Sequence, residues 1–148
     1  MTIKELRANN CTQVTTKNGV YIVRVPDNFD VHFTSNTTAM RTFKTENDML
    51  YDPCLLEEKY ILSNTRVVYI GKAERKGGIR ARVRELVRYG NNECKNHRGG
   101  RAIWQIIDNE SLILEEMPID YTRYASARDM EKAMLLKYEN LPVGNQEY

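Results

Sequence analysis

Two runs rich in β-branched and aromatic residues constrain the fold of this chain. They cover residues 19–25 and 66–71, and a Pro-Asp-Asn turn ends the first. This composition is typical of β-strands. Directly after the second run, residues 77–89 carry apolar side chains at helical spacing, and a Gly-Asn-Asn sequence stops the pattern. The combination predicts layered strands and helices, not a coiled coil or a sandwich.

The other segments support a mixed architecture. Further helices are expected at residues 2–9, 53–62 and 126–139, and further strands at residues 31–33, 101–107 and 112–116. Residues 27–50 are mostly polar and should form a loop, and Ser126 and Asp129 have the spacing of a helix capping pair. We expect an α/β (α+β) fold with a small central mixed or antiparallel sheet of three to five strands flanked by helices. A chain of 148 residues is the usual length of one domain, so we expect a single domain that spans residues 1–148.

Positive charge is concentrated in one stretch. Between Lys72 and Arg101 there are ten basic and three acidic residues, a balance of +7, whereas the whole chain has a net charge of +2, so the rest carries −5. Such focused charge is typical of a site for a polyanion. A basic helix considered alone fits a solvated surface equally well.

Cysteine usage and hydropathy exclude several classes of protein. Cys11, Cys54 and Cys94 are far apart and odd in number, which argues against a disulfide framework and against a zinc site. No N-terminal apolar run resembles a signal peptide, and no run approaches the about 18 apolar residues of a membrane span. We expect a reduced, soluble, cytoplasmic protein that does not enter a membrane.

The arginines of the basic helix fall into two groups. At about 100° per residue, Arg80, Arg84 and Arg88 follow one border of the apolar face and suit solvent or phosphate contacts. Arg82 projects from the opposite border, next to Tyr89, where the core can hold its guanidinium in a fixed direction. Alternatively, Arg82 is a structural residue whose aliphatic stem covers the edge of the core. If the helix is considered without the other motifs, this structural role is favoured.

A glutamate and two tyrosines add further candidates. Glu131 falls inside the apolar sector of the last helix, where a carboxylate must be paired or bind a cation, unless it points to water near the helix start. One carboxylate with waters and a substrate phosphate is a normal site for Mg²⁺. Tyr21 and Tyr69 each lie in a predicted strand, and pairing of these strands would bring both phenols near Gly71. Tyrosines in strands are more often core residues.

Taken together, these runs resemble the GIY-YIG nuclease family. The matching segments are Gly19-Val20-Tyr21, Tyr69-Ile70-Gly71 with Lys72-Ala73, Ile79-Arg80-Ala81-Arg82, Met130-Glu131-Lys132-Ala133, and Leu141-Pro142 with Gly144-Asn145. His97-Arg98-Gly99-Gly100-Arg101 and Ile103-Trp104-Gln105 resemble the loop and third strand of some bacterial members. The likeness covers residues 19–25 and 67–148.

The resemblance implies an endonuclease that hydrolyses phosphodiester bonds, with DNA as the expected partner. It implies one divalent cation, Mg²⁺ or Mn²⁺, at Glu131. Arg82 would stabilise charge on the phosphate, Tyr21 would help to activate water and Tyr69 would position the phosphate or the water. Lys72 is the cation expected to assist the Tyr21 phenol.

The remaining implied roles are supporting ones. Gly71, Asn145, His97 and Tyr89 are expected near the site. Arg80, Arg84, Arg88, Arg98 and Arg101 are expected to contact the nucleic-acid backbone without reading sequence. A binding module of the same fold that does not cut is the alternative function.

The chain departs from the family pattern in three places. Residues 26–65 separate the two tyrosine motifs, which usually lie about ten residues apart in this family, so they form an insertion. Val20 replaces an isoleucine. Leu86 stands four residues after Arg82, where many members have a tyrosine or a histidine.

Overall fold

The computed structural model describes residues 1–37, 39, 50–94 and 97–146 of the chain. In chain order the elements are α1 (Ile3–Ala8), β1 (Gly19–Arg24), α2 (Pro53–Ser63), β2 (Val67–Ala73), α3 (Gly78–Gly90), η1 (Arg98–Gln105), η2 (Asn109–Ser111), β3 (Ile113–Pro118) and α4 (Ala127–Leu135), where η marks a 3₁₀ helix. Among the described residues, no helix combines the length and the apolar composition that a bilayer crossing needs.

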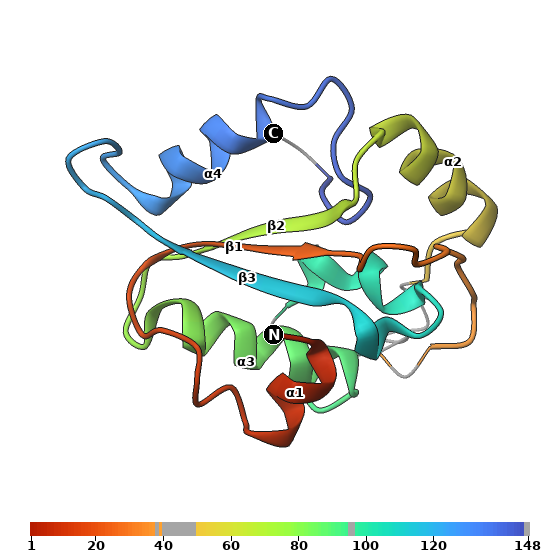
Figure 1. Cartoon of the computed structure of the whole chain (residues 1–148), viewed down its shortest axis with the longest axis horizontal. Coiled ribbons are helices and arrows are strands. Elements are labelled where there is room, and N and C mark those ends of the chain that lie inside the picture. The colour runs from red at the N-terminus through yellow and green to blue at the C-terminus, as the bar shows by residue number, and fades with distance from the viewer. Residues whose placement is uncertain (38, 40–49, 95–96, 147–148) are drawn as a thin grey trace.

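A three-stranded antiparallel sheet with the order β2-β1-β3 lies at the centre (Figure 1). The expected α+β fold with a small central sheet is therefore confirmed. β1 pairs directly with β2 although residues 26–65 separate them, and the register places Tyr21 opposite Gly71 and Val23 opposite Tyr69. The two tyrosine motifs are thus neighbours in the sheet.

The two faces of the sheet carry different layers. α4 covers one face, while α1 and α3 lie on the other (Figure 1). Since successive side chains of a strand point to opposite faces, Val20 and Ile70 pack with α4, whereas Tyr21 and Tyr69 belong to the larger core on the α3 side. That larger core also contains Ile79, Val83, Leu86, Ile103 and Trp104.

The start of α3 is fixed by the chain that precedes β1. Gly78 has a φ of +54°, and a Cβ there would lie 2.1 Å from the Thr16 carbonyl oxygen, so both conformation and space require glycine. The backbone N–H groups of Ile79 and Arg80 donate to the carbonyls of Lys17 and Thr15, each at 2.9 Å. These contacts fix α3 beneath the sheet.

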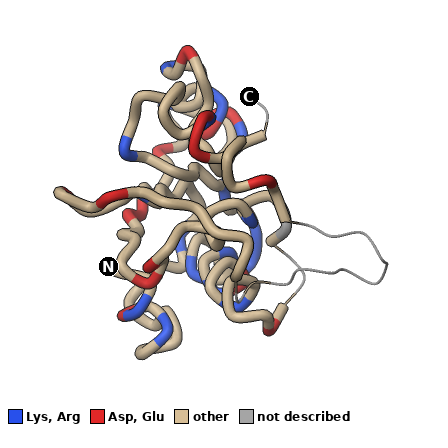
Figure 2. Tube along the Cα trace, turned by 90° about the vertical axis from the view of Figure 1, so that its right-hand side faces the viewer, with Lys and Arg blue, Asp and Glu red and all other residues tan. Residues whose placement is uncertain are grey.

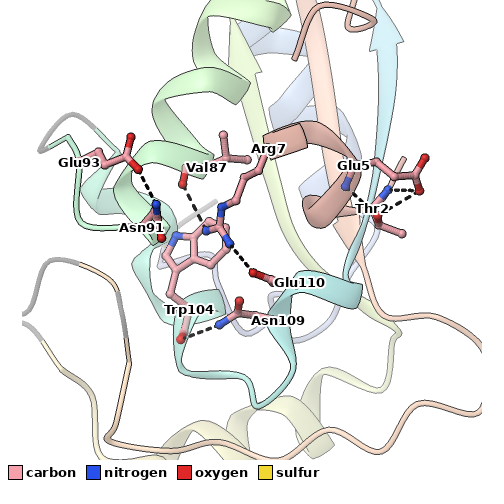
Figure 3. A network of polar contacts seen from close by, with 9 residues as sticks. All are labelled: Thr2, Glu5, Arg7, Val87, Asn91, Glu93, Trp104, Asn109 and Glu110. Carbon is pink, nitrogen blue, oxygen red and sulfur yellow. Dashed lines mark hydrogen bonds and ion pairs between the residues drawn. The ribbon is translucent and has the colours of Figure 1, made fainter. Parts of the chain in front are cut away.

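The strand predicted at residues 101–107 is wrong, because this segment forms the 3₁₀ helix η1 and its exit. Ala102, Ile103 and Trp104 are consecutive and all buried, and periodicity cannot separate a strand from a helix in such a run. The Trp104 ring packs on Gly90, where a Cβ would lie 2.4 Å from the indole, and the Arg7 guanidinium carbon lies 5.3 Å from the ring centroid (Figure 3). This tight packing of Trp104 favours the 3₁₀ helix over the extended strand that was predicted.

Two other predicted elements are shorter than expected. The last helix ends at Leu135 instead of residue 139, and the strand at 31–33 is reduced to a single bridge between Phe33 and Ile106. Ser126 caps α4 as predicted, because its hydroxyl accepts from the Asp129 N–H at 3.1 Å.

The insertion at 26–65 contributes α2 and is tied to η1. The buried Gln105 amide accepts from the Tyr51 N–H at 2.9 Å and donates to the carbonyls of Thr34 and Tyr51 at 3.1 and 2.8 Å. Residues 38 and 40–49, most of the second half of the predicted loop at 27–50, lie outside the described residues.

Candidate functional site

The two tyrosines of the motifs lie together on the α3 side of the sheet. The ring centroids of Tyr21 and Tyr69 are 6.2 Å apart, and both side chains are buried. A Cβ at Gly71 would lie 2.3 Å from Tyr21 Cζ, so glycine lets the Tyr21 ring pass across β2. The proximity expected from strand pairing is present in the structure.

His97, just before η1, joins this pair. Its Nε2 lies 2.6 Å from the Tyr21 hydroxyl, and its ring centroid lies 5.6 Å from that of Tyr69. Burial, followed by the nearby positive charge of Arg82, lowers the pKa of His97 to about 3. The imidazole is therefore neutral at physiological pH, and within the described residues its Nδ1 has no hydrogen-bond partner.

Arg82 reaches the tyrosines from α3. Burial raises the pKa of Tyr21 well above its ordinary value and that of Tyr69 to about 12, while the Arg82 guanidinium opposes both shifts. Arg82 Nη1 lies 3.1 Å from a Glu85 carboxylate oxygen one helical turn away, and Arg75 binds the same carboxylate. The cation beside the Tyr21 phenol is therefore Arg82, whereas Lys72 faces another group.

Glu131 approaches from α4, on the opposite face of the sheet. One of its carboxylate oxygens lies 3.8 Å from Lys72 Nζ, and 18% of its side chain is exposed. Burial raises the pKa of Glu131, against the lowering effect of Lys72 and Arg128. The Glu131 charge raises the pKa of Tyr69, so this carboxylate and the Tyr69 phenol are electrostatic neighbours.

A basic groove lies at the end of β2, and of the predicted site residues only Arg82 and Lys72 line it. Its volume is about 330 Å³. Its lining residues are Lys72, Ala73, Glu74, Arg75, Arg82 and Arg128. Of the lining residues, Arg82 belongs to α3 and Arg128 to α4, two helices that lie on opposite faces of the sheet (Figure 1). The arrangement suits a phosphate group held between Arg82 on one side and Lys72 or Arg128 on the other.

Asn145 binds the outer edge of β2, the edge that does not face β1. Its side-chain amide donates to the Ile70 carbonyl and accepts from the Ile70 N–H, both at 2.9 Å. Lys59 Nζ donates to the Asn145 carbonyl at 2.6 Å, which links α2 to the same point. Asn145 therefore lies near the site, as predicted, and it fixes the strand that carries Tyr69 and Gly71.

The predicted backbone-contacting arginines have different surroundings. Arg80 donates to the carbonyls of Val14 and Thr12 at 2.8 and 2.9 Å, and Arg84 donates to the Asn10 carbonyl at 2.9 Å, whereas Arg88 is exposed. The Arg101 guanidinium carbon lies 4.7 Å from the Tyr51 ring centroid, and the Arg98 side chain lies outside the described part. Basic residues recur along α3 (Figure 2). That these arginines contact nucleic acid stays a prediction, and so does the supporting role of Tyr89, which is fully buried in the core.

Glu131 is the predicted metal ligand, and it offers one carboxylate, which is paired with Lys72. In the described residues there is no group of three or more histidine, cysteine, aspartate or glutamate side chains that could hold a metal ion. A cation here would thus be held by the Glu131 carboxylate, by waters and by a substrate phosphate, which is how Mg²⁺ is commonly bound. Glu131, whose side chain is 18% exposed, supplies only the single carboxylate of such a site, and the positive charges of Lys72 and Arg128 act on it.

Two residues of the site were missed from the sequence. Arg128 precedes Glu131 by three residues on α4, a spacing that places both on one helix face, so the signal was present. Glu85 follows Arg82 by three residues on α3 in the same way.

A larger cavity lies at the other end of the sheet. Its volume is about 880 Å³, and Pro26, Arg7 and Ile113 are among its lining residues. The register places Ile113 opposite Arg24, far from the Val20–Lys72 pair at the groove. The four predicted catalytic residues do not line this cavity; they are Tyr21, Tyr69, Arg82 and Glu131.

Comparison of the chain with models of known protein families, with characterised proteins and with solved structures finds no match. The resemblance to the GIY-YIG family therefore depends on the motif residues themselves.

Proposed function

We propose that this chain is a divalent-metal-dependent endonuclease of the GIY-YIG type that hydrolyses phosphodiester bonds in DNA. The observation that carries the proposal is that Tyr21, Tyr69 and Arg82 lie together on the α3 face of edge strand β2, next to a basic groove lined by Arg82 and Lys72, with Glu131 paired to Lys72 from the α4 face. These residue types suit phosphodiester hydrolysis: an arginine for phosphate charge, a carboxylate for a cation and phenols for positioning.

The proposed role of each residue follows from its surroundings. Arg82 binds a non-bridging oxygen of the scissile phosphate and stabilises the charge that develops there. A divalent cation held at Glu131 would supply neutralisation of charge on the phosphate and on the leaving oxygen. Tyr21 holds its proton at neutral pH, since burial raises its pKa, and its fully buried hydroxyl acts by positioning the neighbouring Arg82 and Tyr69 side chains. The neutral His97 imidazole, 2.6 Å away, fixes the direction of that hydroxyl.

Partner and location belong to the same proposal. The groove accepts the backbone of a nucleic acid through charge, without base readout. Cys11, Cys54 and Cys94 are free thiols, which suits a reducing cytoplasmic location.

The second candidate is a nucleic-acid-binding module that does not cut. One observation favours it: Lys72 already pairs with Glu131, the carboxylate that a metal requires. Leu86, which stands where many family members carry a polar side chain, is fully buried.

Incubation of supercoiled plasmid with the chain and Mg²⁺ or Mn²⁺ separates these candidates. The endonuclease nicks or linearises the plasmid, and Glu131→Gln and Arg82→Ala each lower the rate by about 10²-fold or more with binding retained. Asp129→Asn is the matched control, because it removes an exposed carboxylate from the same helix. Binding without cleavage in either metal supports the module, and absence of salt-sensitive binding contradicts both.

A further inference from the structure

We propose that the larger cavity, at the end of the sheet away from the basic groove, binds a nucleoside. Its volume is about 880 Å³, which lies in the range of about 300–1,000 Å³ that is usual for sites of small organic ligands. The nucleoside is either free or the terminal unit of a nucleic-acid strand. This inference does not depend on the nuclease activity proposed above, because the cavity and the basic groove share no described lining residue.

Trp104 gives this cavity a hydrogen-bond donor without a partner. The residue lines the cavity and is fully buried, and its Nε1 meets no acceptor among the described residues. Burial of an unsatisfied donor is costly, and an indole N–H can only donate. The occupant must therefore bring an acceptor, such as a carbonyl oxygen or a ring nitrogen.

Arg7 supplies a second such donor next to the indole. Its Nη1 and Nη2 donate to a Glu110 carboxylate oxygen at 3.4 Å and to the Val87 carbonyl at 3.3 Å, whereas its buried Nε has no partner in the part of the chain that the structure describes (Figure 3). The Arg7 guanidinium carbon lies 5.3 Å from the centroid of the Trp104 ring, and Gly90 also packs on this ring. A ligand therefore meets the indole at its N–H and not at a face of the ring.

A small movement at Asn91 opens the way to the indole N–H. The Trp104 Nε1 is closed to water in the structure, so an acceptor reaches it only after a neighbouring side chain turns. Asn91 lines the same cavity and is exposed, so it can turn without disturbing the core. Rotamer changes of this kind are common on binding, and the Asn91 amide then offers a donor and an acceptor to the ligand.

The charges around the cavity favour a ligand without net charge. Lys4 and Arg7 are its positive lining residues, and Asp108 and Glu110 are its negative ones. The basic groove differs, because its lining has four positive residues and one negative. Asp108 and Glu110 are exposed and can accept hydrogen bonds from hydroxyl groups. A sugar provides such hydroxyls and adds no charge.

Apolar residues complete the described lining. They are Pro26, Ile106, Ile107 and Ile113. Their side chains suit the flat faces of a heteroaromatic base, as apolar walls do in most small-molecule sites. A nucleoside combines these faces with acceptors for Trp104 and hydroxyls for Asp108. A free sugar lacks the flat faces, and a carboxylate or a phosphate adds a charge that Asp108 and Glu110 repel.

The first test follows the indole N–H of Trp104 by heteronuclear NMR of the full chain. Trp104 is the one tryptophan in the sequence, so it gives a single indole cross-peak. Titration with adenosine, cytidine, guanosine and uridine should shift this peak, with a dissociation constant of about 0.1 mM for the preferred nucleoside, as is usual for a ligand of this size. No shift with any of the four well above that concentration overturns the proposal, and so does an equal shift with ribose alone.

Asp108→Asn tests the contact with the sugar. Asp108 has a φ of +60°, a conformation that asparagine also adopts, so the variant should fold. It should weaken nucleoside binding about fivefold, because a neutral acceptor holds a hydroxyl less strongly than a carboxylate does. Asp129→Asn is the matched control and should bind as the wild type does, since it removes an exposed carboxylate from α4 with the same change in net charge. Equal affinities in the two variants contradict the assignment.

A further titration identifies the source of the nucleoside. A short oligoribonucleotide with a free terminal ribose is compared with the same strand carrying a phosphate on that ribose. If the end of a strand is the ligand, the free end shifts the indole peak at a lower concentration than the nucleoside does, and the terminal phosphate abolishes the shift. If the free nucleoside is the ligand, neither strand shifts the peak. Equal shifts by both strands overturn the recognition of the hydroxyl groups.

Discussion

Gly71 and Tyr21 share one position of the sheet, because the tyrosine ring lies where a side chain at residue 71 would project. A Cβ at Gly71 would lie 2.3 Å from Tyr21 Cζ, so Gly71→Ala must displace the ring or the strand. We expect a loss of about 1–3 kcal/mol in the free energy of unfolding, as for overpacked cores. Urea denaturation followed by circular dichroism measures this loss.

Gly99→Ala is the control for that substitution. Gly99 is exposed, and the nearest atom to a Cβ there is the Tyr69 hydroxyl at 4.0 Å. The same change of residue should therefore alter stability by less than about 0.5 kcal/mol. Equal losses for the two variants would contradict the close packing of Tyr21 on Gly71.

His97 should make the fold sensitive to acid. Its pKa is about 3 in the folded protein because burial disfavours the charged imidazole, whereas an unfolded histidine titrates near its ordinary value of about 6.5. Below that value the unfolded chain binds a proton that the folded chain does not, so stability falls as pH falls and is unaffected above it. The expected slope is about 1.4 kcal/mol per pH unit between about pH 6 and pH 4.

Denaturation by urea at several pH values measures this slope in the wild type and in His97→Gln, which lacks the titrating group. The slope should be smaller in the variant by about 1.4 kcal/mol per pH unit, which is the contribution of one titrating proton. His32→Gln serves as control, since His32 is exposed and its imidazole lies 3.8 Å from Glu57. A slope that is identical in wild type and His97→Gln would show that His97 is not buried as the neutral form.

At the scale of the element, the edge of β2 depends on Asn145. The amide satisfies both the N–H and the carbonyl of Ile70, which are buried. Asn145→Ala leaves these two backbone groups without partners, and we expect a loss of about 2–4 kcal/mol in the free energy of unfolding. Hydrogen exchange of the Ile70 amide should also accelerate.

Asn140→Ala is a suitable control, because Asn140 is exposed and its amide donates to the Leu62 carbonyl at 3.2 Å. It should leave the Ile70 amide protected. Unchanged exchange at Ile70 in Asn145→Ala would mean that another group covers this edge.

At the scale of the whole molecule, the sequence predicted the sheet and the helices better than the segments between them. Strands β1 and β2 have strong β-propensity and α3 has a clear helical period, so local signals agree with the fold. The segment around Trp104 was wrongly predicted as a strand, because its conformation depends on packing against Gly90 and Arg7, which are distant in sequence. Periodicity carries no information about such contacts.

The candidate site followed from the sequence only in part. The pairing of Tyr21 with Gly71 could be inferred from the two motifs, and the structure confirms that the strands are neighbours. The hydrogen bonds from Arg80 to the carbonyls of Val14 and Thr12 could not be inferred, since a sequence does not show which backbone carbonyls of a loop will lie near a given side chain. An arginine on a helix border looks the same whether it faces solvent or a loop.

The distribution of charge over the molecule gives a last prediction, on salt dependence. The basic groove and the exposed Arg88 present about four or five positive groups, so the logarithm of the association constant for duplex DNA should fall with the logarithm of salt concentration with a slope of about −3 to −5. Arg88→Gln should reduce the slope by about 1, because one phosphate contact is lost. Arg84→Gln should leave the slope unchanged and instead lower stability by about 1 kcal/mol, because its guanidinium binds the Asn10 carbonyl. Anisotropy titrations of a labelled duplex at several salt concentrations measure all three slopes. A slope near zero in the wild type would contradict a nucleic-acid partner, whereas equal reductions in both variants would mean that Arg84 leaves its loop to bind phosphate.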